Sequence, residues 1–239
     1  KTRELFAGNN VILALDADEV LTSNCLADGE FHQLLGSLAM GRSVVLQWIA
    51  LWQDPAKYRS DRSIWGNSWK HFIFRDDRVS RFSDRATSEP RMPERFLANS
   101  IKYEPVKVLH YQFVDWDRML AKQRRYRVYD FLQKPSWLQA LKVNDFYFIT
   151  KPRSLERGAR LAEVPGGWNK GYAGINLESF KRENFYWQEA DVLAKFAEHG
   201  VRFFRWLDVW DVDWEAKLGR ATSKDKMHIS PLAAKDPRS

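Results

Sequence analysis

Residues 11–21 read Val11-Ile-Leu-Ala-Leu-Asp-Ala-Asp-Glu-Val-Leu21, a short continuous apolar run that passes into acidic residues. A run of this length, bounded by polar residues, is typical of a strand buried on both faces. Open α/β sheets bind their ligands at the carboxyl ends of such strands. The stretch therefore predicts an α/β protein whose chemistry lies beside Asp16 and Asp18.

Other segments extend this prediction along the chain. We expect strands at 43–52, 69–74, 106–110 and 201–210, helices at 30–38, 115–133 and 186–199, and loops at 54–67, 80–100 and 150–170. Together they predict a mixed central sheet with flanking helices. We expect a catalytic region at 1–134, a Trp-rich extension at 135–219 and a polar tail at 220–239.

The composition excludes several classes of protein. The 239 residues hold 38 Lys and Arg against 31 Asp and Glu, and the net charge of +7 favours an anionic partner. The one cysteine, Cys25, permits neither an internal disulfide nor a Cys-rich zinc site. The sequence holds no apolar stretch long enough to span a bilayer, and no Gly-rich dinucleotide or P-loop motif.

The acidic pair Asp16 and Asp18 is open to two chemical interpretations. Oxygen ligands at the end of a strand suit Mg²⁺ or Mn²⁺ held on a nucleotide-sugar diphosphate. Alternatively, Asp16 is the nucleophile and Asp18 the general acid of a haloacid-dehalogenase-like phosphohydrolase. Against the second, Glu19 and Val20 stand where that motif usually continues Gly-Thr. A solvated loop without function is the third possibility.

His110 ends an expected strand and precedes a basic helix. A neutral imidazole is a suitable further ligand for Mn²⁺, although a single His at a strand end is more often structural. Arg118, Lys122 and Arg125 follow at spacings of three or four residues, which places them on one stripe of the helix. Such a stripe matches a diphosphate or an anionic lipid headgroup. It also fits a non-enzymatic module that binds an anionic ligand.

Three ordered motifs carry a resemblance to a known family. They are Leu15-Asp-Ala-Asp-Glu-Val-Leu21, Lys70-His-Phe-Ile-Phe-Arg75, and Val108-Leu-His110 followed by Lys122-Gln-Arg-Arg-Tyr126. The set resembles family 2 glycosyltransferases of the A-type fold, in the bacterial branch that includes lipopolysaccharide-core glucosyltransferases. The resemblance covers about residues 5–130.

The resemblance implies a role for each candidate residue. Asp16, Asp18 and His110 would hold Mn²⁺ or Mg²⁺ on the donor diphosphate, and Lys122, Arg75 and Arg118 would bind the donor. An acidic residue between the third strand and the His strand would be the catalytic base. Glu89 fits this place best and Asp84 second, with Ser88 where the family commonly has a His.

The implied reaction is metal-dependent inverting transfer of a sugar from a nucleotide-sugar to a glycan, lipopolysaccharide or glycolipid acceptor. A cytoplasmic location, with contact to the inner face of the membrane, and no nucleic-acid partner are expected. The family's nucleotide-binding strands precede the acidic pair, and only fifteen residues do so here. We therefore expect that these 239 residues alone do not transfer sugar.

The C-terminal third is rich in aromatic residues, from Trp168 to Trp214. Aromatic rings stack on sugar faces, so an acceptor platform is conceivable. We favour the simpler interpretation, a Trp-rich core.

Overall fold

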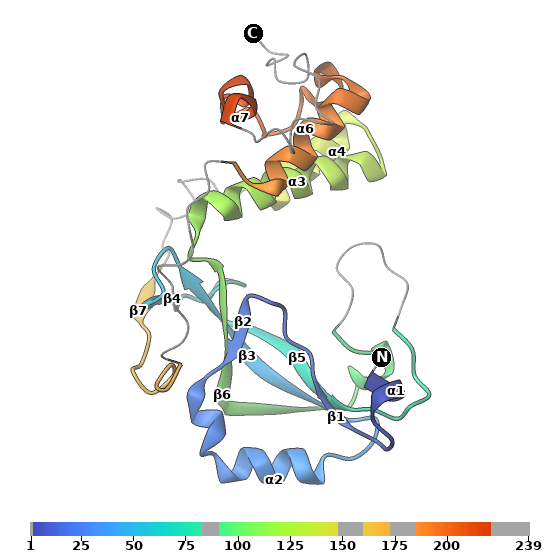
Figure 1. Ribbon diagram of the computed structural model, residues 1–239, viewed down its shortest axis with the longest axis vertical. Coiled ribbons are helices and arrows are strands. Elements are labelled where there is room, and N and C mark those ends of the chain that lie inside the picture. Colours follow the sequence, from blue (N-terminus) through green and yellow to red (C-terminus); the bar gives the residue numbers. More distant parts are fainter. Residues whose placement is uncertain (1, 83–90, 148–159, 173–184, 221–239) are drawn as a thin grey trace. The chain divides into compact units, whose positions relative to one another are not determined.

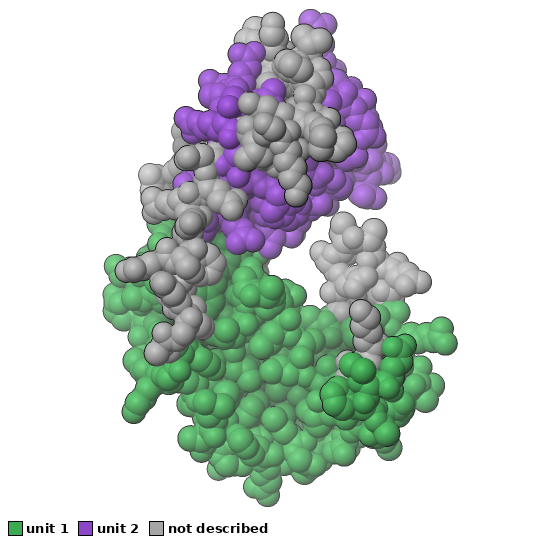
Figure 2. Space-filling model, viewed as in Figure 1, with its two compact units in different colours: residues 1–114, 160–177 green, residues 115–159, 178–239 purple. Residues whose placement is uncertain are grey.

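The computed structural model describes residues 2–82, 91–147, 160–172 and 185–220 (Figure 1). The chain divides into two compact units, residues 1–114 with 160–177, and residues 115–159 with 178–239 (Figure 2). This division differs from the expected boundary at residue 134, because the helix that follows residue 115 packs against later helices. The expected α/β class, with a mixed sheet and flanking helices, is confirmed.

Unit 1 holds the sheet. Its strands are β1 (Val11–Leu13), β2 (Glu19–Leu21), β3 (Ser43–Trp52), β4 (Lys57–Arg59), β5 (Ser68–Arg75), β6 (Ser100–Phe113) and β7 (Leu161–Glu163). Its helices are α1 (Thr2–Leu5) and α2 (Gly29–Ser37), with 3₁₀ turns η1 (Ser23–Leu26) and η2 (Glu94–Phe96). The strand order is β1-β5-β3-β4-β7, and β6 pairs with both β3 and β2. Among the strand pairs of the described residues, only β3–β6 is parallel.

The apolar run 43–52 forms the central strand, as expected. β3 lies between β5 and β6 and is buried along nearly its whole length. β6 is longer than the expected 106–110 and carries a register shift, since Val45 pairs with Lys102 and Gln47 with Lys107. Pro105 lies within this shift, where its missing N–H costs no ladder hydrogen bond.

Two expected strands differ from the structure. Residues 11–15 are not a doubly buried strand: β1 is a three-residue edge strand, antiparallel to β5, with Val11 and Leu13 exposed. Residues 201–210 are not a strand: they begin with the 3₁₀ turn η5 (Val201–Phe204). Phe204, Leu207, Val209 and Trp210 are the buried residues of the run, and this spacing does not alternate along the chain as a strand's would.

Unit 2 is helical, with α3 (Trp116–Gln133), α4 (Trp137–Phe146), α6 (Trp187–His199) and α7 (Trp214–Arg220). The side chain of Asp115 caps α3, and Gly200 at φ 79° ends α6, both as the sequence indicates. The simpler interpretation of the C-terminal third holds in part: Trp210 and Trp214 lie in a core, whereas Trp187 and Trp206 are exposed. The core residues are Val128, Phe131, Ala140, Val143, Val192, Leu193, Phe196, Phe204, Leu207, Val209, Trp210 and Trp214.

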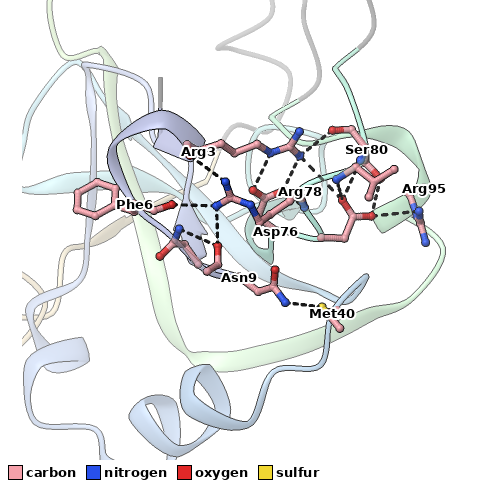
Figure 3. A network of polar contacts seen from close by, with 12 residues as sticks. Arg3, Phe6, Asn9, Met40, Asp76, Arg78, Ser80 and Arg95 are labelled. Atoms are coloured by element: carbon pink, nitrogen blue, oxygen red, sulfur yellow. Dashed lines mark hydrogen bonds and ion pairs between the residues drawn. The ribbon is translucent and has the colours of Figure 1, made fainter.

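A polar network ties the N-terminal residues of unit 1 to the turn after β5 (Figure 3). Arg3 donates to both carboxylate oxygens of Asp76, at 2.8 and 2.5 Å, and to the carbonyl of Ser80. Arg78 donates to the carbonyls of Arg3, Phe6 and Gly8. The Asp76 side chain is buried, and the hydrogen bond from Arg3 lowers its pKa below the ordinary value.

We expect Arg3→Ala to destabilise the protein by about 1–3 kcal/mol at neutral pH, because a buried carboxylate loses two hydrogen bonds. Since the folded pKa of Asp76 is depressed, this stabilisation is present above the unfolded pKa of about 3.9 and is lost as the pH falls. Urea unfolding at pH 7 and pH 3 measures it. Arg62→Ala, an exposed arginine of the same unit, is the control. An equal loss at both pH values would contradict the prediction.

Candidate functional site

The acidic stretch forms a tight turn anchored to β6. The N–H of Glu19 donates to the carbonyl of Asp16 at 3.0 Å, and the N–H of Asp16 donates to the Glu19 carboxylate at 2.9 Å. β2 then pairs antiparallel with β6, which places Glu19 opposite His110. The N–H of Tyr111 donates to the carbonyl of Asp18 at 2.9 Å. The pairing brings the acidic turn beside the histidine.

Asp18 and His110 meet at this point. His110 Nε2 lies 3.4 Å from Asp18 Oδ2, and the side chains are 4% and 36% exposed, respectively. Aromatic rings hold the imidazole: Trp48 lies 4.3 Å away, centroid to centroid, and Phe113 lies edge-on at 5.8 Å. A ring with so little freedom presents its nitrogen to the half-exposed carboxylate in a defined orientation.

A buried carboxylate lies directly behind this pair. Glu19 has a fully buried side chain and accepts hydrogen bonds from Arg91 Nη1 at 2.5 Å and from Arg91 Nη2 at 2.7 Å. Trp48 Nε1 donates to the same carboxylate at 2.7 Å. Trp48 therefore connects the two pairs, because its ring contacts His110 while its N–H binds Glu19.

The environment of Glu19 favours its ionised form. Burial opposes ionisation most strongly, but the hydrogen bonds from Arg91, Asp16 and Trp48, with the charge of Arg91, outweigh it, and the pKa is lowered. A buried carboxylate with a fork-shaped guanidinium partner is a rigid element. It fixes the turn that carries Asp16 and Asp18.

Asp16 is more exposed than Asp18 and has a different partner. Arg91 Nη2 binds its carboxylate at 2.7 Å, and Arg91 Nη1 also donates to the carbonyl of Ala14. Arg91 packs over the ring of Phe72 on β5. The structure therefore brings Asp18 to His110 and Asp16 to Arg91, rather than joining all three expected metal ligands.

Arg91 also lines a cavity of about 420 Å³ in unit 1. Its apolar wall includes Ile12, Ala14, Phe74 and Phe82, and its polar wall includes Arg3, Asp76 and Arg81. The cavity and the acidic turn thus share one arginine.

Arg75, expected as a donor-binding residue, has a structural contact. Its Nη1 donates to the carbonyls of Gly36 and Leu38, at 3.3 and 3.1 Å, around the C-terminus of α2. A cation near helix C-terminal carbonyls is a stabilising arrangement. We therefore do not assign Arg75 to the site.

Arg118 and Lys122 lie on α3, in unit 2, whereas the acidic turn lies in unit 1. Arg118 is exposed, and Lys122 lies 5.7 Å from the ring of Tyr126. The third member of the stripe, Arg125, forms an ion pair with Asp191, with 2.5 Å between Nε and Oδ2. The two candidate bases, Asp84 and Glu89, lie outside the described residues.

Asp18 and His110 are the two expected metal ligands that the structure brings into contact, at 3.4 Å. Within the described ranges, no group of three or more His, Cys, Asp or Glu side chains is arranged to hold a metal. Mg²⁺ is often bound through one or two carboxylates, with substrate phosphates and water completing the shell. Asp18 and His110 could supply one carboxylate oxygen and one imidazole nitrogen to such a shell.

Sequence reasoning missed Glu19 and Arg91. Glu19 follows the acidic pair and precedes the apolar residues Val20 and Leu21. This apolar continuation is the signal that Glu19 belongs to a strand. Arg91 has no such signal, because its partners are 72 and 75 residues away. Among the helices that the structure describes, none combines the length and apolar character that a bilayer crossing requires.

Comparison with known proteins adds no relative: no family model, no curated protein and no solved structure matches the chain.

Proposed function

We propose that the chain carries the acceptor- and cation-binding part of a metal-dependent inverting glycosyltransferase of the A-type fold. The enzyme would move a sugar from a nucleotide-sugar to a glycan, lipopolysaccharide or glycolipid acceptor. The mixed sheet is compatible with an α/β fold. The proposal rests on one observation: Asp18 and His110, 92 residues apart in sequence, lie 3.4 Å from one another at the end of an acidic turn.

Asp18, His110 and the residues that position them would then have the following parts in the reaction. Asp18 and His110 would hold Mn²⁺ or Mg²⁺, which when bound offsets the charge on the departing diphosphate. Trp48 keeps the imidazole in place, and Glu19 with Arg91 keeps the turn in place. Asp16 extends from the same turn. An acidic side chain of the segment 83–90, Glu89 first and Asp84 second, would take the proton from the acceptor hydroxyl.

Mn²⁺ binding to the 239-residue chain tests this proposal. We expect the chain to bind Mn²⁺, and a nucleoside diphosphate to tighten that binding by about tenfold, because phosphate oxygens complete the metal's shell. The matching nucleoside, which lacks phosphates, should leave the affinity unchanged. Electron paramagnetic resonance of free Mn²⁺ measures both.

Two results would overturn the proposal. If a nucleoside diphosphate does not change the affinity for Mn²⁺, the cation does not take part in binding the donor diphosphate. A covalent phosphoryl group on Asp16, formed with Mg²⁺ and a phosphate ester, would instead make the chain a phosphohydrolase.

A further inference from the structure

Unit 2 carries an exposed apolar surface that the proposed reaction does not use. On α4, Ala140 and Val143 are buried in the core. Trp137, Leu138, Leu141 and Phe146, on the same helix, are exposed. Residues 137, 138 and 141 follow each other at helical spacing, so they form one stripe on the solvent side.

Hydrogen bonds join residues 206–208 to α4. The Asn144 side chain donates to the carbonyl of Trp206 and accepts from the N–H of Asp208, both at 2.8 Å. The exposed indole of Trp206 therefore belongs to the same part of unit 2. We call the five residues Trp137, Leu138, Leu141, Phe146 and Trp206 the α4 face.

Basic side chains outnumber acidic ones among the exposed residues close in sequence to the α4 face. In residues 134–147 and 201–207, the exposed charged side chains are Lys134, Lys142, Arg202 and Arg205 against the single acid Asp145. The guanidinium of Arg205 lies 3.8 Å from the ring of Trp206. A cation next to an exposed indole is an arrangement suited to the boundary between water and lipid.

We propose that the α4 face docks the protein on an anionic lipid bilayer. Exposed Trp, Leu and Phe with Lys and Arg nearby are the residue types by which peripheral helices enter the headgroup layer. The surplus of positive charge matches anionic headgroups. A second copy of the chain is a poorer occupant, because it would bring two sets of like charges together. The proposal assigns a surface to the membrane contact expected from the sequence, and it rests on the exposed side chains of unit 2 rather than on the sugar-transfer site.

Co-sedimentation of the 239-residue chain with lipid vesicles tests the docking. We expect binding to phosphatidylcholine vesicles that contain about one third phosphatidylglycerol, and weak binding to phosphatidylcholine alone. The variant Trp137→Ser with Leu141→Ser should reduce partitioning by about tenfold or more. The variant Lys142→Gln with Arg205→Gln should reduce it by about tenfold and flatten its dependence on salt.

A matched control is available in the same unit. Trp187 on α6 is 57% exposed, as is Trp137, and it lies outside the α4 face. Trp187→Ser should bind vesicles as well as the unchanged protein does, and circular dichroism would verify that all variants fold. Equal binding to both vesicle types, an equal loss in Trp187→Ser, or self-association that depends on Trp137 in place of vesicle binding would each overturn the proposal.

Discussion

Replacing Asp18 with alanine is expected to weaken Mn²⁺ binding by about a hundredfold or more. The carboxylate lies 3.4 Å from His110 Nε2 and would supply the oxygen ligand of the proposed cation site. Even residues that only support metal ligands change affinity by about 10–100-fold, so loss of a ligand should cost at least as much. In an enzyme form that turns over, the same change should abolish metal-dependent release of nucleoside diphosphate. Manganese resonance and a coupled diphosphate assay measure the two effects.

The Asp18 prediction has two controls. Glu104→Ala removes an exposed carboxylate of the same unit, which pairs with Lys102, and should leave Mn²⁺ affinity unchanged. His110→Ala should reproduce most of the loss, because it removes the other ligand. Full affinity in Asp18→Ala would reject the cation site and leave the turn as a structural element.

Replacing Arg91 with alanine is expected to destabilise the protein by about 3–5 kcal/mol, because it leaves the fully buried carboxylate of Glu19 without its charge partner. Arg91 makes two hydrogen bonds to Glu19 and one to Asp16, so the acidic turn also loses its anchor. Equilibrium unfolding in urea measures the free energy of unfolding. Arg95→Ala, which removes an exposed arginine paired with Asp77, should cost about 1 kcal/mol or less.

A second substitution separates the ion pair from simple packing. The variant Arg91→Ala with Glu19→Gln should be more stable than Arg91→Ala alone, because no buried charge is left uncompensated. If the double variant is no more stable, the lost energy lies in the other contacts of Arg91, which are those with Phe72, Asp16 and the carbonyl of Ala14.

The pH dependence of the free energy of unfolding should reflect the Glu19–Arg91 ion pair. The folded pKa of Glu19 is lowered, so its contribution to stability is present above the unfolded pKa of about 4.3 and is lost as the pH falls through the folded pKa. In Arg91→Ala, burial without a partner raises that pKa, and acid then favours the folded state. The stability difference between the two proteins should therefore shrink as the pH falls from 7 to 3.

The sequence predicts those elements whose signal is local. The apolar run 43–52 is β3, the cap at Asp115 begins α3, and Gly200 ends α6. The sequence does not predict the short strands β1 and β2 correctly. Three residues carry too little pattern to indicate that a strand lies at the sheet edge or pairs antiparallel. The aromatic run 201–210 also misled, because a dense apolar stretch fits a strand and a 3₁₀ turn equally well.

The sequence by itself determined the chemistry available: an acidic stretch at 16–19, a histidine at 110, a basic helix and a surplus of aromatic rings. These follow from residue type and local spacing. Only the tertiary structure decided which acid meets the histidine and which is buried against Arg91. The strand register that does so joins β2 to β6 across about ninety residues of chain, and backbone pairing over such a separation depends on the packing of the whole sheet.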